Sequence, residues 1–339
     1  MFLLLAGKFI FMAMKTEQYS KIISCDWGTS NLRLRLVELP ALKIIATVTS
    51  SLGIAETHNQ WKQRGGEREQ FYLQELSKEI GLLETEAGYN LHGVPVFLSG
   101  MASSTLGIRE LPYAKLPFEI NGNSSVTAWI ENGSFHHPIY IISGVCSEND
   151  VVRGEETQLV GIAANEKVFG INEYLLVLPG THSKHMKISS GKLMEFKTFM
   201  TGEYFNLLIE HSVLRNSVHP LHHLDPETKP AFLAGVKASE NANLLHESFM
   251  VRTNILFNKY NEIENGQYLS GLLIGYELRG LQQQNIVIAA GASLYSRYIA
   301  ALEYLYPETN TIMMDPATLD LAVIRGQLAI FNKTSNKNE

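Results

Sequence analysis

Several features that mark large protein classes are absent from this 339-residue chain. It has only two cysteines, Cys25 and Cys146, which lie far apart in no metal-like spacing, and this usage fits the reducing cytoplasm. Its formal net charge is −6, so no strong basic field attracts phosphates and we expect no nucleic-acid partner. There is no G-x-x-x-x-G-K-S/T, no G-x-S-x-G, no H-E-x-x-H and no G-x-G-x-x-G after a strand. The common nucleotide, hydrolase and zinc-protease motifs are therefore missing.

Long apolar runs are also missing beyond the first residues. The segment MFLLLAGKFIFMAM is too short to span a bilayer, has Lys8 inside the run, and is followed by no clear small-residue cleavage site. We interpret residues 1–18 as a non-native N-terminal extension, with the natural chain beginning at Met12 or Met14. No membrane partner is expected.

The composition is that of an ordered globular protein, with 45% hydrophobic and 18% charged residues. The length suits two lobes better than one core. Short apolar runs predict strands over residues 21–26, 32–39, 43–50, 94–100 and 138–144, three more within 174–200, and others over 285–291 and 311–315. Helical spacing predicts helices over 67–88, 150–165, 202–215, 228–240, 247–260, 268–281, 293–305 and 317–331.

A strand–turn–strand–strand unit occurs twice, at 21–50 and at 174–200. The first turn follows Asp26 and contains Gly28, Thr29, Ser30 and Asn31, with Arg33 on the next strand. The second turn contains Gly180, Thr181, His182, Ser183 and Lys184. This repeat predicts an α/β protein with two lobes, each a mixed sheet with an antiparallel hairpin start and flanking helices, and a ligand held in the cleft between them. The expected lobes are 19–167 with 317–339, and 168–316.

The two Gly-Thr turns suit phosphate binding. Glycine lets the backbone approach oxygens closely, successive N–H groups can surround an anion, and Thr, Ser and Lys side chains add donors. A carboxylate beside phosphate requires a cation, so Asp26 is the predicted Mg²⁺ ligand, acting through water. The alternative is an ordinary pair of β-turns, which favour the same residue types.

Five stretches in order resemble one family. They are DWGTSNLR, NDVVRGEETQL, LPGTHSKH, FKTFMTGE and LSGLLIGYEL, and they look like the 2-dehydro-3-deoxygalactonokinases of the actin-like (ribonuclease H-like) sugar kinase superfamily. The resemblance covers about residues 21–330. It departs at the N-terminal extension and at GMASST (100–105), where family members tend to carry a Gly-Met-Val-Gly-Ser stretch.

The resemblance implies ATP-dependent phosphorylation of 2-dehydro-3-deoxy-D-galactonate on O6, in galactonate catabolism. In superfamily sugar kinases an Asn-Asp pair opens the helix that links the lobes, so Asp150 is the predicted proton acceptor, at a helix N-terminus that favours an anion. Asp150 could instead serve only as a helix cap. Glu155 and Glu156 are the second choices, unless they simply face solvent.

Other residues are expected to hold the substrates. A guanidinium suits the carboxylate of a keto acid, and the candidates are Arg109 and Arg153, which could also form surface ion pairs. Gly100, Ser103 and Ser104 follow a strand and could contact sugar hydroxyls. Gly291 and Ala292 open a helix beside the expected adenosine site.

Two other functions share the first turn. One is a phosphohydrolase of the exopolyphosphate or guanosine pentaphosphate type, and the other is a sensor that binds nucleotide or sugar without catalysis. The expected partners are a sugar acid and ATP. The oligomeric state is open, with a homodimer as the candidate assembly, and the preference between the galactonate-derived acid and its C4 epimer is open as well.

Overall fold

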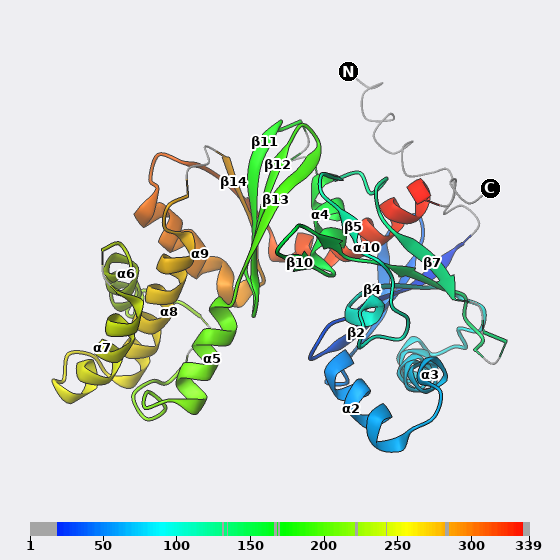
Figure 1. The fold of residues 1–339 in the computed structure, drawn as a ribbon, viewed down its shortest axis with the longest axis horizontal. Coiled ribbons are helices and arrows are strands. Elements are labelled where there is room, and N and C mark those ends of the chain that lie inside the picture. Colours follow the sequence, from blue (N-terminus) through cyan, green and yellow to red (C-terminus); the bar gives the residue numbers. More distant parts are fainter. Residues whose placement is uncertain are drawn as a thin grey trace. The chain divides into compact units, whose positions relative to one another are not determined.

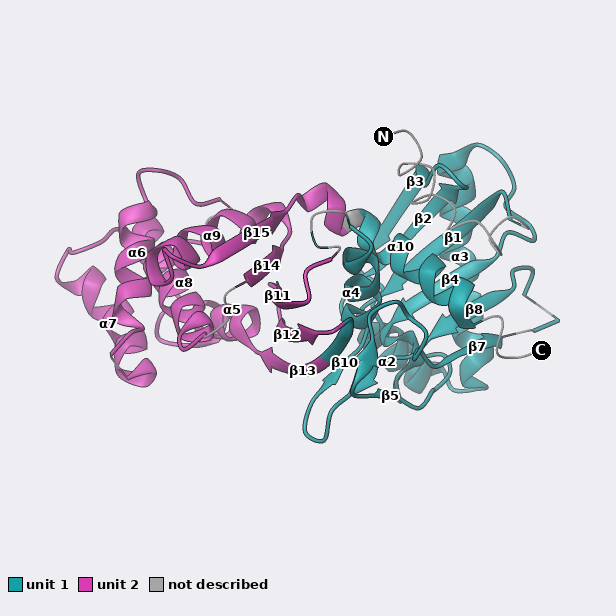
Figure 2. Cartoon of the chain, turned by 90° about the horizontal axis from the view of Figure 1, so that it is seen from above, with its two compact units in different colours: residues 1–169, 191–193, 320–339 teal, residues 170–190, 194–319 magenta. Residues whose placement is uncertain are grey.

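The computed structural model describes residues 19–334, except residues 131, 134, 166, 167, 169, 221, 222, 242 and 282–284. The predicted extension at 1–18 lies outside the described residues. The chain divides into two compact units, shown in separate colours in Figure 2. Unit 1 comprises residues 1–169, 191–193 and 320–339, and unit 2 comprises 170–190 and 194–319. Within the described ranges, no helix has the length and apolarity that a membrane crossing requires.

Unit 1 is built on a mixed sheet in the order β3-β2-β1-β4-β8-β7. Strands β1 (Lys21–Trp27), β2 (Leu32–Glu38) and β3 (Lys43–Ser50) form an antiparallel meander. Strands β4 (Val96–Gly100) and β8 (Ile139–Ile142) run parallel to β1, and β7 (Thr127–Ile130) is antiparallel to β8. The parallel pairing aligns Asp26 on β1 with Ser99 on β4, so the carboxyl ends of these strands lie together.

Helices of unit 1 cover this sheet (Figure 1). They are α2 (Ile54–Arg64), α3 (Arg68–Ala87), α4 (Glu155–Ala163) and the part of α10 (Pro316–Thr334) from residue 320 onward. Helix α3 begins where Glu67 accepts hydrogen bonds from the amides of Glu69 and Gln70, and it ends at Gly88 with φ 80°. Short elements complete the unit: η2 (Met101–Ser103), β5 (Ala114–Lys115), β6 (Phe118–Glu119), β9 (Val145–Cys146) and β10 (Val151–Val152).

Helix α10, near the C-terminus, packs against α4 and is hydrogen-bonded to the central strands of unit 1. A Cβ on Gly161 of α4 would lie 1.9 Å from the carbonyl oxygen of Ala322, so only glycine permits this helix contact. Gln327 is fully buried, and its side chain bonds Ser24, the Cys25 carbonyl and Ser99 at 2.7–3.0 Å. These bonds join the last helix to strands β1 and β4.

Unit 2 repeats the sheet order. Its strands are β11 (Glu173–Leu178), β12 (Ser183–Ser189), β13 (Lys192–Phe199), β14 (Asn285–Ala289) and β15 (Asn310–Met314), in the order β15-β14-β11-β12-β13. Strand β12 is antiparallel to β11, whereas β14 is parallel to both β11 and β15. The helices are α5 (Thr201–His211), α6 (Lys229–Ala238), α7 (Leu244–Leu256), α8 (Glu262–Leu278) and α9 (Ala292–Leu305).

The predicted α/β class, with mixed sheets that each begin in an antiparallel hairpin, is confirmed. In both units the third, second, first and fourth strands of the sheet lie side by side in that order; β8 and then β7 follow in unit 1, and β15 follows in unit 2. Sequence periodicity missed α2, because IAETHNQWKQR has few apolar residues. The units divide at 169/170 and 319/320, whereas the expected lobes divided at 167/168 and 316/317. Residues 191–193 belong to unit 1, where Lys192 and Leu193 pair with β6.

Candidate functional site

The first Gly-Thr turn, here called hairpin 1 (residues 28–31), joins β1 to β2. The amide of Gly28 donates to the carbonyl of Asn31 at 2.9 Å, which closes the turn. Thr29, Ser30 and Asn31 are exposed, as a phosphate-binding turn requires. Arg33 is also exposed and lies directly across from Asp26 in the β1–β2 register.

Hairpin 1 is supported by the start of α2. The amides of Ile54 and Ala55 donate to the carbonyls of Gly28 and Thr29 at 2.9 and 3.1 Å. A Cβ on Gly53 would lie 2.3 Å from the Thr29 carbonyl oxygen, so a side chain at that position would displace the turn. The helix missed by sequence reasoning is thus the element that holds the first turn, and Gly53 was its only local signal.

Asp26 stands at the end of β1, beside hairpin 1, and is half-buried. A Cβ on Gly100 would lie 3.2 Å from the Oδ1 atom of Asp26, so the end of β4 lies against the Asp26 carboxyl. Burial raises the pKa of Asp26, the charges of Arg33 and Arg35 lower it, and the charge of Glu155 raises it. The Asp26 carboxyl therefore lies within the electrostatic influence of two arginines and of a second carboxylate, Glu155.

The start of α4 meets the end of β4 through two glycines. Gly100 and Gly154 have φ values of 89° and 105°, in the left-handed region that favours glycine. A Cβ on Gly154 would lie 3.3 Å from the Cα of Gly100. Glu155, the first residue of α4, accepts a hydrogen bond from the Arg153 amide at 3.0 Å. The predicted substrate residue Gly100 and the second-choice base Glu155 are thereby brought to one place.

The expectation that Asp150 begins a helix is wrong. Residues 151–152 form strand β10, which pairs with β9, and α4 begins only at Glu155 with Gly154 as its N-cap. The β-branched pair Val151-Val152 favours a strand, and the positive φ of Gly154 interrupts any helix that would start earlier. Asp150 lies in a turn, where its Oδ1 accepts the Val151 amide at 2.7 Å. The stabilisation of an anion by a helix N-terminus applies to Glu155 and Glu156 instead.

Glu156 does not face solvent, the alternative considered for it. It is 1% exposed, and its carboxylate accepts hydrogen bonds from the Gly154 amide at 2.7 Å and the Thr157 hydroxyl at 2.8 Å. Burial, followed by the charge of Glu155, raises the pKa of Glu156 to about 7. A carboxyl that titrates near neutral pH is a common feature of functional sites.

The two predicted substrate arginines differ in their surroundings. Arg153 donates from Nη1 to the carbonyl and hydroxyl oxygens of the fully buried Ser103 at 2.5 and 2.6 Å, and it stacks over the Tyr113 ring at 4.0 Å. Arg109 instead forms an ion pair with Glu69 at 2.8 Å and donates to the Trp129 carbonyl. Among the predicted substrate residues, Arg153 and Ser103 are therefore in contact.

The remaining predicted serine lies in the same loop. Ser104 is 5% exposed, and its hydroxyl accepts the Leu106 amide at 3.3 Å. Its contact with a sugar hydroxyl stays a prediction.

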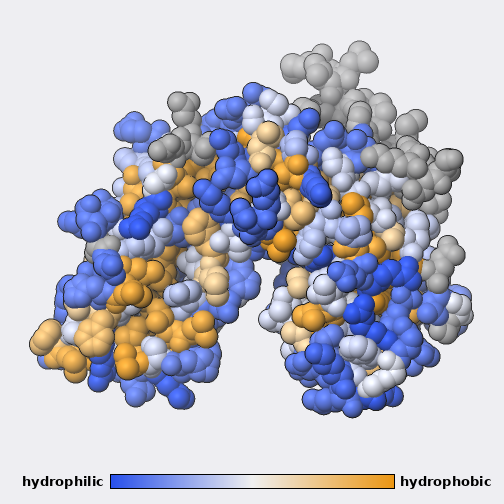
Figure 3. All heavy atoms as spheres, in the orientation of Figure 1, coloured by the Kyte–Doolittle hydropathy of each residue, from blue (hydrophilic) through white to orange (hydrophobic). Residues whose placement is uncertain are grey.

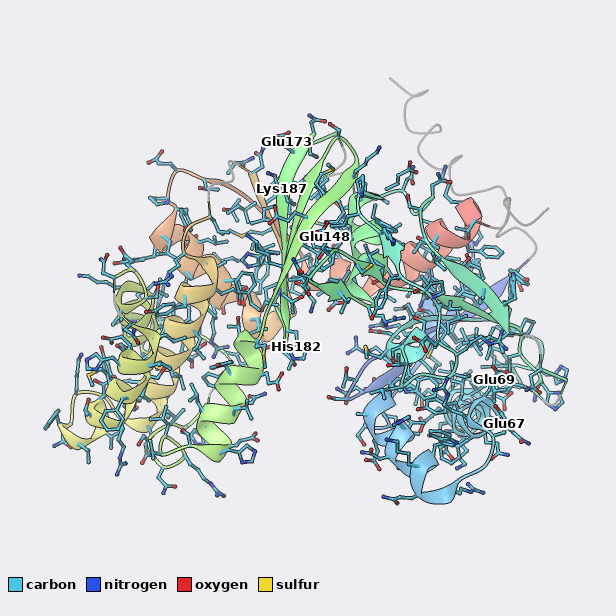
Figure 4. The ribbon with its side chains drawn as sticks, in the orientation of Figure 1. Glu67, Glu69, Glu148, Glu173, His182 and Lys187 are labelled. Carbon is cyan, nitrogen blue, oxygen red and sulfur yellow. The ribbon has the colours of Figure 1, made fainter. Side chains whose placement is uncertain are left out.

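The second turn, here called hairpin 2 (residues 179–184), joins β11 to β12 in unit 2. The Gly180 amide donates to the Ser183 hydroxyl at 3.4 Å, and Thr181 and His182 are exposed. Lys184 is 4% exposed, and its ammonium donates to the His182 carbonyl at 2.8 Å. The His182 ring meets the Glu203 carboxylate of α5 at 2.5 Å; Figure 4 shows His182 where hairpin 2 meets this helix.

Hairpin 2 is supported in the way hairpin 1 is. The amide of Glu203, near the start of α5, donates to the Thr181 carbonyl at 3.1 Å. A Cβ on Gly202 would lie 2.7 Å from the Gly180 carbonyl oxygen. In each unit, therefore, a glycine at the start of the next helix allows that helix to pack directly on the turn.

Beneath hairpin 2 lies a buried polar cluster that sequence reasoning missed. Glu277 of α8 accepts hydrogen bonds from Tyr298 of α9 at 2.6 Å and from Thr201 of α5, and it pairs with the His185 ring at 2.9 Å. The Tyr298 hydroxyl also meets the Ser183 hydroxyl at 3.0 Å. The available signal was Glu277 itself, a charged residue inside the apolar helix pattern LSGLLIGYEL.

The expected adenosine residues open α9. Gly291 is the N-cap of that helix after β14, and both Gly291 and Ala292 are exposed. Their contact with a nucleotide stays a prediction.

No group of three or more His, Cys, Asp or Glu residues suited to a metal occurs among the residues described. Mg²⁺ keeps several water ligands and needs only one or two carboxylates, so Asp26 with Glu155 nearby fits it.

The chain is similar to known proteins in both sequence and structure. The model of the 2-keto-3-deoxy-galactonokinase family matches residues 26–324. A 2-dehydro-3-deoxygalactonokinase of Escherichia coli K12 is 28% identical over 309 residues, covering 88% of this chain and 94% of its own. A protein provisionally assigned that activity in Rhizobium meliloti is 30% identical over 231 residues, covering 62% of this chain and 70% of its own. A crystal structure from Sinorhizobium meliloti, with the same provisional assignment, superimposes with a TM-score of 0.73 at 25% identity, covering 92% of this chain and 98% of its own.

Proposed function

The chain belongs to the 2-keto-3-deoxy-galactonokinase family, and on this basis we propose that it uses ATP to phosphorylate 2-dehydro-3-deoxy-D-galactonate on O6. The product is 2-dehydro-3-deoxy-6-phosphogalactonate, a step of galactonate catabolism. The observation that carries the proposal is the family match across residues 26–324, which spans both Gly-Thr turns.

Unit 1 supplies the sugar-acid site in this proposal. The Arg153 guanidinium, already oriented by Ser103 and Tyr113, binds the substrate carboxylate, while Gly100 and Ser104 contact its hydroxyls. Arg109 is the weaker candidate, because Glu69 already neutralises its charge. A guanidinium held by packing loses little freedom when it binds a carboxylate.

The reaction transfers one phosphoryl group. The O6 oxygen forms a bond to the γ-phosphorus, the bond from that phosphorus to the β,γ-bridging oxygen breaks, and ADP leaves with the electron pair. The O6 proton passes to a carboxylate. Glu155 is the proposed acceptor, because it is the residue that opens α4 and it lies close enough to Asp26 to affect its charge. Asp150 is the alternative acceptor.

Both turns are proposed to bind the phosphates of ATP. In hairpin 2 the exposed Thr181 and His182 and the Lys184 ammonium supply donors and positive charge, and Gly291 with Ala292 borders the adenosine. In unit 1 the donors come from Gly28 to Asn31, with Arg33 beside them. Mg²⁺ would be held by Asp26 through water, where it would neutralise charge on the phosphates.

Two other functions share parts of this site. A phosphohydrolase would release phosphate from ATP or polyphosphate without a sugar acid, and a sensor would bind ligand without turnover. The relatives matched over most of their length favour the kinase. The deciding experiment measures ADP release with a panel of 2-keto-3-deoxy sugar acids, including the C4 epimer. The proposal requires ADP formation that depends on the galactonate-derived acid; ADP release at the same rate without any sugar acid contradicts it.

We also propose that the chain works in the cytoplasm as a homodimer. Leu245, Phe249 and Leu256 lie on one side of α7, away from the buried Val251, and with Phe257 they are 53–82% exposed. Figure 3 shows apolar side chains gathered over α7. Together they expose on the order of 600 Å², most of the roughly 800 Å² that one partner gives to a standard interface.

A second copy would cover this stripe, since a two-fold interface pairs the same patch with itself. Leu245→Glu should therefore convert a dimer into a monomer in sedimentation velocity. A wild-type chain that sediments as a monomer at micromolar concentration contradicts the proposal.

A further inference from the structure

We propose that Glu277 is a positioning residue that holds hairpin 2 in the conformation that binds nucleotide phosphates. This inference rests on the proposed function and extends it to a residue that touches no substrate. Glu277 is 4% exposed, and its two carboxylate oxygens are both occupied by neighbouring donors.

The hydrogen bonds form one connected path from Glu277 to the turn. Its Oε2 accepts the Tyr298 hydroxyl at 2.6 Å, the Tyr298 and Ser183 hydroxyls meet at 3.0 Å, and Ser183 accepts the Gly180 amide at 3.4 Å. Ser183 is fully buried, so this end of the turn is held from inside the unit and not by solvent. The position of Gly180 and Thr181 therefore depends on the Glu277 carboxylate through three successive hydrogen bonds.

A second path reaches the turn through α5. The Thr201 hydroxyl, in the first residue of α5, donates to Glu277, and two residues later the Glu203 amide donates to the Thr181 carbonyl. On the other side of hairpin 2, the His185 ring pairs with Glu277 Oε1 at 2.9 Å. Four elements, β12, α5, α8 and α9, thus converge on one carboxylate.

The charge of this carboxylate is part of the arrangement. Burial raises the pKa of Tyr298 well above its usual value, and the Glu277 charge raises it further, so Tyr298 remains a hydroxyl that donates. A charged acceptor is stronger than an amide acceptor and can take several donors at once. A Gln at this position keeps the shape, but its neutral oxygen is a weaker acceptor for the Thr201 and Tyr298 hydroxyls, and its NH₂ group pairs with the His185 ring only when that ring nitrogen accepts.

The test compares three variants of the full chain. Glu277→Gln and Tyr298→Phe both interrupt the path, and Tyr306→Phe is the matched control. Tyr306 is the C-cap residue of α9 and bonds the Leu278 carbonyl and the Leu281 amide, but it has no bond to Glu277. ADP binding with Mg²⁺, and sugar-acid binding separately, are measured by titration calorimetry. Amide hydrogen exchange is followed in residues 180–184 and, for comparison, in residues 28–31.

Glu277→Gln should weaken ADP binding by about tenfold and Tyr298→Phe by about threefold. Sugar-acid binding should change less than twofold, and Tyr306→Phe should leave both affinities unchanged. Exchange in residues 180–184 should accelerate in the two path variants and stay unchanged in residues 28–31.

Unchanged ADP affinity and exchange in Glu277→Gln overturns the inference, as does an equal loss of both ligands. If Glu277→Gln fails to fold, Tyr298→Phe decides by the same criteria. The exchange measurement separates this inference from the proposed function. Faster exchange at hairpin 2 in the two path variants supports the positioning role, whether or not the wild-type chain binds ADP. A wild-type chain that fails to bind ADP would contradict only the proposed kinase activity.

Discussion

The two Gly-Thr turns have the same frame but differ in what holds them. Hairpin 1 is held by backbone bonds from α2 and by the Trp27 indole, which donates to the Leu52 carbonyl at 2.9 Å. Hairpin 2 has the corresponding helix contact at Gly202, and in addition the buried cluster around Glu277. Both units thus have the same turn and a glycine that lets the following helix pack on it, while the side chains beneath the two turns differ.

The placement of acidic residues differs in the same way. In unit 1 the carboxylates of Asp26 and Glu155 stand where strand ends and a helix start meet. In unit 2 the carboxylate of Glu277 lies under the turn and has donors on both oxygens. Under the proposed function, the unit 1 acids serve proton transfer and cation binding, whereas the unit 2 acid supports a turn proposed to bind phosphate.

The largest expected effect tests the acid that opens α4. Glu155→Gln should lower kcat on the order of 10³-fold, because general acid–base catalysis contributes 10²–10⁴-fold, and ADP binding should remain. Asp150→Asn, the matched variant, should lose less than about tenfold. Steady-state kinetics by coupled ADP detection measures both. The opposite ranking would return the proton acceptor to Asp150.

In each unit, a Gly→Ala substitution adds one methyl group where the helix packs on the turn, and this should lower the free energy of unfolding. Gly53→Ala should destabilise the chain by about 3 kcal/mol and Gly202→Ala by about 1 kcal/mol, since overpacking costs roughly 1–3 kcal/mol and the added Cβ comes closer at Gly53. Urea unfolding measures both.

Gly81→Ala is the control for these two variants. Gly81 lies in α3 with nothing near its absent Cβ, and this change should stabilise by roughly 0.5–1 kcal/mol. If Gly53→Ala unfolds with the same free energy as the wild-type chain, the turn can shift without loss of stability, which contradicts this prediction.

The cation site distinguishes unit 1 from unit 2. Asp26→Asn should raise the Mg²⁺ concentration for half-maximal activity by about tenfold, because one carboxylate near the phosphates is lost. Glu277→Gln, which removes a carboxylate from unit 2, should leave that concentration unchanged. Activity against Mg²⁺ concentration is the measurement, and an unaltered requirement in Asp26→Asn removes this residue from the site.

A further prediction concerns pH. Because Glu156 has a pKa near 7 in the folded chain and an ordinary value of 4.5, the folded chain keeps a proton that the unfolded chain has released in that window. Stability therefore falls as pH rises from about 4.5 to 7, by at most about 3 kcal/mol.

Glu156→Gln should remove this slope, with a net gain of about 1 kcal/mol at pH 8 because some hydrogen bonding is lost. Thermal unfolding at pH 5 and pH 8 measures it. An equal pH dependence in the variant and the wild-type chain would be incompatible with a titrating Glu156.

Most of the fold was predictable from local pattern. Period-two and continuous apolar runs located β1, β2, β4 and β11, and the helical spacing of Phe71, Leu76 and Leu83 located α3. The pattern failed where contacts beyond the segment decide the structure. Helix α2 is held against hairpin 1, and the pairing of Val151 and Val152 with β9 delays the start of α4.

Some of the grouping in the candidate site was also predictable, because Gly-Thr turns and strand-end carboxylates have a local signature. The sequence predicts Asp26, Gly100, Arg153 and Ser103 as site residues, and in the structure Asp26 lies against Gly100 while Arg153 bonds Ser103. Local pattern does not indicate the pairing of Glu277 with Tyr298, since a buried polar cluster joins residues that are distant along the chain.

The order of residues alone determined the class of most segments, the repetition of the turn and the family, because these depend on side-chain periodicity and on short motifs. The tertiary structure decided which carboxylates stand together and which are buried. Burial and charge proximity are properties of packed elements, and they decide whether a given acid is a cap, a proton acceptor or a support for a turn.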